Sequence, residues 1–301
     1  MIKLGDADTA VAGGAESMSR GGYLLPTLRS GQRMGDASVV DAMTGALHDP
    51  FGHGHMGVTA ENIAAQFGFT REQQDAFAVE SHRRAANALD KGYFKDQVIP
   101  IELKSKKGVE QFTRDEHVRP GAKIEDLAKL KAVFKKDGTV TAGNASGIND
   151  AGAAIVMMEA GAAAKKGLKP KARLVAYAHA GVEPHVMGLG PIPAVMRVFE
   201  KSGLKPADMD VIESNEAFAA QAMAVTKDLG LDPAKVNPNG GAVALGHPIG
   251  ATGAILTVKA LHELERTQKR YALVTMCIGG GQDRKSTRLN SSHMSESRMP
   301  S

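Results

Sequence analysis

From residue 171 to residue 276, short apolar runs alternate with stretches that have helical spacing. Three apolar runs predict strands, at residues 173–177, 210–213 and 271–276. The last run is apolar throughout, which is typical of a strand that is buried on both faces. Helices are predicted at residues 194–201, 216–228 and 250–266, with Asn215 placed to cap the second of them. This alternation predicts a layered α/β fold.

The first part of the chain has a weaker pattern. Residues 9–12 predict a short buried strand, preceded by a stub of helix that ends at Gly5. The clearest helix signal follows Thr70, because Thr70 and Gln73 form a capping-box pattern ahead of an apolar stripe. This start, a buried strand behind a helix stub, resembles a fold that has been cut into at its N-terminus.

Between these regions the pattern is ambiguous. Residues 137–142 predict a strand that leads into the glycine-rich loop 143–147, and residues 151–164 predict a small-residue helix or strand packed in a core. The last stretch, residues 283–301, is rich in serine and has no periodicity. We predict that it is a disordered tail foreign to the fold.

Composition narrows the class of protein. The 301 residues are 43% apolar and 23% charged, as in globular proteins, and the net charge of +4 is too small to indicate nucleic-acid binding. No apolar run is long enough for a membrane span, and the first residues do not resemble a secretory signal. The single cysteine, Cys277, excludes an internal disulfide and a cysteine-based metal site. We therefore expect a cytoplasmic protein that binds neither nucleic acid nor membranes.

Candidate chemistry gathers in three glycine-bearing segments of the C-terminal half, residues 215–219, 239–253 and 276–281. Each follows a predicted strand or begins a predicted helix, where open α/β sheets place their sites. Cys277 and His247 can act as nucleophile and base, or as two acid–base groups. The alternative is that Cys277 is a small core residue and His247 an ordinary loop histidine.

Taken together, these segments resemble the thiolase family. Six motifs occur in the family's order: GGAESMS (13–19), HMG (55–57), GNASG (143–147), NEAFA (215–219), GHPIG (246–250) and CIGGG (277–281). The resemblance runs from Met1 to Gln282, and it is greatest to the biosynthetic β-ketothiolases. It implies an α/β fold of five layers, α/β/α/β/α, made of two similar halves with a loop domain inserted in the first.

The resemblance also implies a domain division. Residues 1–17 and 148–169 would belong to the N-terminal half, residues 18–147 to the loop domain that binds coenzyme A, and residues 170–282 to the C-terminal half, with 283–301 outside the family pattern. The family's nucleophilic cysteine belongs to a segment with no counterpart here. We therefore predict that this polypeptide, as written, does not cleave acetoacetyl-CoA.

The family's catalytic roles carry over to four residues. His247 would deprotonate the nucleophilic thiol and then donate to the thioester oxygen, at an oxyanion site that Asn215 completes through a water. Cys277 would remove the α-proton of acetyl-CoA, and the backbone N–H of Gly279 would serve a second oxyanion hole. Such donors stabilise the charge of a carbanion-like centre by about 3 kcal/mol each.

The resemblance places the coenzyme A contacts in the loop domain. Ser146 and the backbone of Ala142 would hold the pantetheine arm, His55 would lie near the thioester, and Arg119 near the nucleotide. Four apolar residues would line the acyl and pantetheine tunnel unless they are plain core: Met56, Phe134, Met187 and Phe218. We expect no metal, because the nearby histidines lack ligand spacing, and no cofactor, because the coenzyme A thioesters are substrates.

The expected activity is therefore reversible Claisen condensation and thiolysis by an acetyl-CoA C-acetyltransferase. Its partners would be acetyl-CoA, acetoacetyl-CoA or another 3-ketoacyl-CoA, and coenzyme A, in a homo-oligomer. A degradative 3-ketoacyl-CoA thiolase with a longer acyl chain is the enzymatic alternative. A non-catalytic remnant that binds coenzyme A, or a Cys–His hydrolase, would be of another class.

Overall fold

The structure is a computed structural model that describes residues 1–281 and 286–290. Within these ranges every helix is too short or too polar to cross a lipid bilayer. Four strands form the central sheet, in the spatial order β7 (Arg173–Ala178), β10 (Ser286–Asn290), β9 (Tyr271–Thr275) and β8 (Val211–Ser214). β8 and β9 are parallel, and β10 is antiparallel to both of its neighbours.

Three strand pairs lie outside this sheet. They are β1 (Thr9–Ser17) with β6 (Asp150–Met158), β2 (Tyr23–Leu24) with β3 (Val40–Asp41), and β4 (Ile101–Ser105) with β5 (Gly108–Phe112). The α-helices are α1 (Ala42–Ala46), α2 (Met56–Phe67), α3 (Arg71–Asp90), α4 (Ile124–Leu127), α5 (Ala160–Lys165), α6 (Pro191–Ser202), α7 (Ala219–Asp228), α8 (Ala242–Leu245) and α9 (Ile249–Thr267). Short 3-10 turns join several of these elements, among them η4 (Pro184–Leu189) and η6 (Gly279–Gly281).

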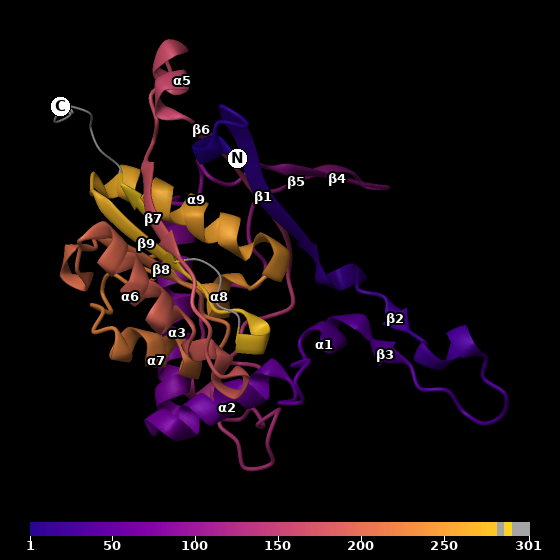
Figure 1. Cartoon of the computed structure of the whole chain (residues 1–301). Helices are drawn as coiled ribbons and strands as arrows, with labels where there is room; N and C mark the ends of the chain where they lie inside the picture. The colour runs from indigo at the N-terminus through magenta and orange to yellow at the C-terminus, as the bar shows by residue number, and fades with distance from the viewer. Residues whose placement is uncertain (282–285, 291–301) are drawn as a thin grey trace.

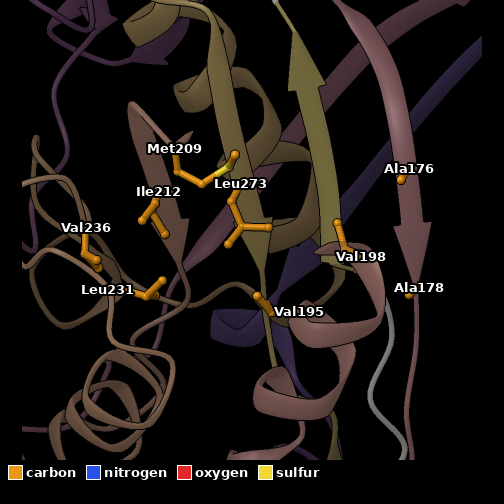
Figure 2. Packing of buried hydrophobic residues seen from close by; sticks show 9 residues of the cluster. All are labelled: Ala176, Ala178, Val195, Val198, Met209, Ile212, Leu231, Val236 and Leu273. Atoms are coloured by element: carbon orange, nitrogen blue, oxygen red, sulfur yellow. The ribbon is translucent and has the colours of Figure 1, made fainter. Parts of the chain in front are cut away.

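The central sheet is apolar on both faces because alternate residues of its strands face opposite helices. Ile212 and Leu273 pack on one face with Val195 and Val198 of α6 (Figure 2). The other face carries a second cluster, in which the neighbouring residues of the same strands contact α9: Val211, Leu256, Ala260, Leu264, Ala272 and Val274. Every residue of β8 is buried, and so are four of the five residues of β9, whose continuous apolar sequence fits a strand covered on both faces.

Helix α9 is shared between two sheets. It contacts β8 and β9 on one side and β1 and β6 on the other (Figure 1). The described residues therefore stack as helix, sheet, helix, sheet, in agreement with the layered α/β fold that the sequence predicts. The boundaries at residues 17, 147 and 169 stay predictions.

A group of helices covers the carboxyl ends of β8 and β9. Helix α3 packs against α7 and α8, and α2 packs against α7 and η4. The capping box predicted at the start of α3 is confirmed, because the Thr70 side chain accepts from the backbone of Gln73 and the Gln73 side chain accepts from the backbone of Thr70. The β2–β3 and β4–β5 pairs project away from this body (Figure 1).

Two expectations about strands are wrong. The strand at residue 9 extends to Ser17 and is not buried, since Val11 is 74% exposed and its cross-strand partner Val156 is 71% exposed. Residues 137–142 form no strand apart from an isolated bridge at Thr141. The reason is that the backbone N–H groups of Thr139 and Val140 donate to the carboxylate of Glu61 instead.

The helix expected at residues 216–228 begins only at Ala219, and the region expected to be a disordered tail contains a strand. Phe218, not Asn215, is the N-cap residue of α7. Ser286–Asn290 form β10, which pairs antiparallel with β7 on one side and with β9 on the other. The rest of the predicted tail, residues 283–285 and 291–301, lies outside the described residues.

Candidate active site

Two of the predicted catalytic residues follow neighbouring parallel strands. Ser214 and Thr275 are paired at the ends of β8 and β9, and the N–H of Asn215 donates to the carbonyl of Thr275 at 2.9 Å. Asn215 comes one residue after β8, and Cys277 comes two residues after β9. Parallel pairing therefore brings both segments to one edge of the sheet, where open α/β sheets bind ligands.

His247 lies in the loop between α8 and α9, and its ring is fixed at both nitrogens. Its Nδ1 is 2.7 Å from the hydroxyl of Thr252, and that hydroxyl itself donates to the carbonyl of Pro248 at 2.8 Å. Because a hydroxyl has one proton, Thr252 must accept from Nδ1–H. The Nε2 lone pair then faces the amide Nδ2 of Asn215, which donates to it at 3.3 Å. This tautomer leaves Nε2 as the basic nitrogen.

The surroundings of His247 favour the neutral ring. Burial lowers the pKa of His247 to about 4, and the carboxylate of Glu16 opposes this shift. At neutral pH the imidazole is therefore an unprotonated base. The amide of Asn215 is 1% exposed, and its Oδ1 is buried without a hydrogen-bond partner among the described residues. This site therefore combines a base with an unused acceptor.

Cys277 is 5% exposed and packs against Met56, Met187 and Ala217, with Phe218 at the margin of the cluster. Four segments distant in sequence thus meet around the thiol. Thr275, two residues before Cys277, pairs with Asn215, and Asn215 donates to His247. Asn215 therefore connects His247 to the segment that contains Cys277, as expected if the two side chains share a pocket.

Gly279 begins the turn η6 two residues after Cys277. A Cβ atom at this position would lie 3.4 Å from Sδ of Met56, so the backbone of Gly279 faces the cluster around Cys277. The turn is also tied to the segment before η4, because the N–H of Val182 donates to the carbonyl of Gly281 at 2.9 Å. The backbone of Gly279 therefore lies against Met56, a member of the cluster around Cys277.

The loop at residues 143–147 is joined to the turn before α7. Ser146 N–H donates to the carbonyl of Ala217 at 3.0 Å, and Ala219 N–H donates to the carbonyl of Asn144 at 2.9 Å. The buried side chain of Asn144 donates in turn to the carboxylate of Asp75 at 2.9 Å. Ser146 is consequently half-buried beside the site, whereas Ala142 is exposed at the start of the loop.

An aromatic row connects His55 to this turn. The His55 ring stacks on Phe134 with centroids 4.7 Å apart, and Phe134 meets Phe218 edge to face at 6.1 Å. His55 also caps α2, since its Nδ1 accepts from the N–H of Gly57 at 3.0 Å. Burial, together with the charge of His48, lowers the pKa of His55. Gly57 is required here because a Cβ atom would lie 2.2 Å from the Phe134 ring.

Arg119 lies apart from the catalytic group. Its side chain is exposed, and its backbone N–H donates to Nδ1 of the buried His82 at 3.2 Å. The neighbouring His117 fills the space where Gly147 lacks a side chain, with a ring carbon 2.2 Å from the missing Cβ position. Arg119 therefore belongs to a segment that contacts the 143–147 loop through His117.

Three residues that reasoning from sequence missed also build the site. Thr252 fixes the tautomer of His247, and Glu16 accepts from the backbone at the start of α9. Glu216 lies behind Asn215, where its carboxylate accepts from Ser81, Asn237 and the backbone of Val243. Glu16 and Glu216 lie inside the quoted motifs, and Thr252 lies five residues after His247, but only long-range contacts give them a function.

Metal ligands are not grouped in the described part of the chain, where no cluster of three or more histidine, cysteine or acidic side chains has suitable geometry. His48 and His55 meet as an edge-to-face ring pair, with centroids 5.3 Å apart. The absence of a metal and of a cofactor stays a prediction.

Comparison with known proteins identifies the family. The profile of the thiolase N-terminal domain matches residues 1–161, and that of the thiolase C-terminal domain matches residues 168–287. The beta-ketothiolase BktB of Cupriavidus necator is 65% identical over 93% of this chain and 72% of its own length. An acetyl-CoA acetyltransferase of Allochromatium vinosum is 55% identical over the same shares of the two chains.

Solved structures agree with this assignment. Human mitochondrial 3-ketoacyl-CoA thiolase superposes with a TM-score of 0.93 at 43% identity, covering 97% of this chain and 74% of that one. The Bacillus anthracis acetyl-CoA acetyltransferase gives a TM-score of 0.93 at 47% identity, covering 96% and 73%. The predicted family and α/β fold are confirmed: the chain belongs to the thiolase family.

Proposed function

We propose that this chain makes and breaks the carbon–carbon bond of a 3-ketoacyl-CoA, as an acetyl-CoA C-acetyltransferase of the thiolase family. The observation that carries the proposal is the arrangement around Asn215, which links a neutral His247 with an unprotonated Nε2 to the segment of Cys277. A base beside a thiol, at a sheet edge with backbone donors, suits the chemistry of a carbanion next to a carbonyl.

In the condensation direction, Nε2 of His247 accepts the proton of an acyl-accepting thiol, which attacks the carbonyl of acetyl-CoA. The expelled coenzyme A thiolate takes the proton of Cys277. Cys277 then removes an α-proton from a second acetyl-CoA, and the imidazolium N–H of His247 donates to the enolate oxygen. The enolate carbon attacks the acyl group, and the released thiolate recovers its proton from His247. Since Cys277 is the only cysteine of the chain, the acyl-accepting thiol comes from a group outside it.

The substrate side is assigned to the 143–147 loop and the aromatic row. We place the pantetheine arm along Ser146 and the backbone of Ala142, and the thioester beside His55, Met56 and Met187. The nearness of Ser146 to Ala217, and the stack of His55 on Phe134, support this path. Arg119 is assigned to the nucleotide end, in keeping with its exposure.

A short acyl chain is favoured by the relatives named as acetyl-CoA acetyltransferases. We also propose that the protein is a cytoplasmic homo-oligomer. Large apolar side chains are exposed on the β2–β3 arm, where Tyr23 is 70% and Met34 92% exposed, and a second copy would cover them.

The base function of Cys277 is testable without the acyl-accepting thiol. The chain is incubated with acetyl-CoA in D2O, and deuterium entering the methyl group is followed by mass spectrometry. We expect exchange that Cys277→Ala abolishes, because Cys277 is the group assigned to remove the α-proton. Equal exchange in the wild type and Cys277→Ala would refute the proposal.

Thiolysis of acetoacetyl-CoA separates the alternatives. The predicted absence of turnover by the chain alone is contradicted by any turnover that Cys277→Ala removes, and Cys277 would then be the nucleophile. An acyl adduct on Cys277 that water releases would instead indicate a hydrolase. Binding of coenzyme A without deuterium exchange would indicate a non-catalytic binding protein.

A further inference from the structure

The proposed reaction requires His247 to keep a proton in surroundings that disfavour its charged form. The proton taken from the acyl-accepting thiol stays on Nε2 until the carbon–carbon bond has formed. Burial opposes this charge. Helix α9 opposes it too, since the helix begins at Ile249, two residues after His247, and its N-terminus carries a partial positive charge of about half a unit.

Helix α9 has no carboxylate of its own at this end. Its N-cap residue is Pro248, which makes no side-chain cap, and its first turn contains no acidic residue. The carboxylate is supplied by Glu16, the second-last residue of strand β1, which contacts the helix. Oε2 of Glu16 accepts from the N–H of Gly250 at 3.2 Å, and Oε1 accepts from its neighbour Ser17 at 3.1 Å.

β1 and α9 approach each other so closely that two positions between them have room only for glycine. A Cβ atom at Gly14 would lie 1.8 Å from the carbonyl oxygen of Gly250, and a Cβ atom at Gly250 would lie 2.4 Å from the carbonyl oxygen of Ala15. Neither position can carry a side chain without moving the backbone. Strand and helix are therefore in direct contact, and this contact brings the Glu16 carboxylate to the first turn that also contains Thr252.

We propose that Glu16 is a positioning residue of the thiolase reaction, which keeps the transferred proton on His247 by neutralising the positive end of α9. This inference rests on the proposed function. In the step concerned, the S–H bond of the attacking thiol breaks, an N–H bond forms at Nε2, and the electron pair stays on sulfur. The transfer turns two neutral groups into a thiolate and an imidazolium, and the carboxylate of Glu16 favours the imidazolium.

The hydrogen-bond partners of the His247 ring, Asn215 and Thr252, are uncharged, and Cys277 follows the neighbouring strand β9. Glu16 favours the protonated ring, against the effect of burial. If Glu16 were only a helix cap, its loss would lower stability and leave the titration of His247 unchanged.

Glu16→Gln tests this distinction, because glutamine is almost the same shape and can still accept from Gly250. The matched control is Glu159→Gln: Glu159 also accepts a backbone N–H at the start of a helix, from Ala162 at 2.7 Å, but at α5. The titration of the His247 ring is followed by NMR on the protein with isotope-labelled histidine. The signal of His247 is identified as the one that is missing from the spectrum of His247→Asn.

We expect the titration midpoint of His247 to fall by about half a pH unit or more in Glu16→Gln, as for loss of a nearby opposite charge, and to stay unchanged in Glu159→Gln. An unchanged midpoint in Glu16→Gln overturns the inference. If that variant does not fold, Glu16→Asp is measured, which keeps the charge one methylene further from the helix. A lower midpoint supports the inference, and a midpoint equal to or above that of wild type overturns it.

The titration needs no turnover, so it is independent of the test of the proposed function. Deuterium exchange into acetyl-CoA reports on Cys277, whereas the His247 midpoint reports on Glu16.

Discussion

Replacing Thr252 by valine removes a hydroxyl that makes two hydrogen bonds, and a matched control shows what the bond to His247 contributes. The hydroxyl accepts from Nδ1–H of His247 at 2.7 Å and donates to the carbonyl of Pro248 at 2.8 Å. Thr252 is 2% exposed, and valine has almost the same shape, so the variant creates little cavity. It leaves an N–H without its acceptor, which costs about 1–3 kcal/mol of unfolding free energy when the group is buried.

The matched control is Thr257→Val on the same helix. Thr257 is 9% exposed and donates to the carbonyl four residues earlier, at Gly253, in the same way at 2.8 Å, but it has no histidine partner. We expect urea denaturation to show that Thr252→Val loses at least about 1 kcal/mol more than the control, since only this variant strands an N–H.

The ring can avoid that cost by moving its proton to Nε2, provided that the amide of Asn215 turns over and offers its unpaired Oδ1. Nε2 would then no longer be a base. The ¹⁵N shifts of the two ring nitrogens distinguish the tautomers, and we expect wild type to be protonated at Nδ1 and Thr252→Val to gain protonation at Nε2. Equal stability losses in the two variants, with an unchanged ¹⁵N pattern, would refute this account of the site.

Three further outcomes follow from packing and burial. Gly57→Ala must displace the Phe134 ring, whose atoms lie 2.2 Å from the added Cβ, so we expect urea denaturation to show a loss of about 1–3 kcal/mol and calorimetry to show weaker coenzyme A binding. Burial lowers the pKa of His82 from 6.5 to about 4, so the neutral ring contributes its full stability above pH 6.5. The free energy of unfolding then falls by up to about 3 kcal/mol as the pH drops from 6.5 to 4. We expect His82→Gln to flatten this part of the curve of stability against pH, and an unchanged slope would contradict the prediction. Lys259→Met leaves the fully buried Glu213 without its ion-pair partner at 2.7 Å, and we expect the free energy of unfolding to fall by about 3–5 kcal/mol. Adding Glu213→Gln to the same chain should restore part of this loss. A double variant no more stable than Lys259→Met would contradict the prediction.

Local chemistry made several elements predictable. The apolar run that became β9 is continuous, as is typical of a strand buried on both faces, and shorter apolar runs marked β7 and β8. The capping box at Thr70 acts within one helical turn, and so it could be read directly. The order of the six motifs identified the family, and with it the pairing of His247 with Cys277.

Other features depended on partners far away in the chain. Residues 137–142 have the composition of a strand, but Glu61, 78 residues before Thr139, takes their backbone donors. Asn215 has the position of a helix cap, but its amide is used by His247 instead. The pattern of residues 286–290 gave no sign of β10, because the gap between β7 and β9 exists only in the assembled sheet.

The sequence by itself thus determined the α/β class, the family, and which loops hold His247, Asn215 and Cys277, since spacing and residue type act over a few residues. Tertiary structure alone decided the tautomer of His247 and the place of Glu16, which meets Gly250 across 234 residues. The physical reason is that hydrogen bonding and burial depend on distance in space. The charge state of a buried ring is set by groups whose nearness no local pattern records.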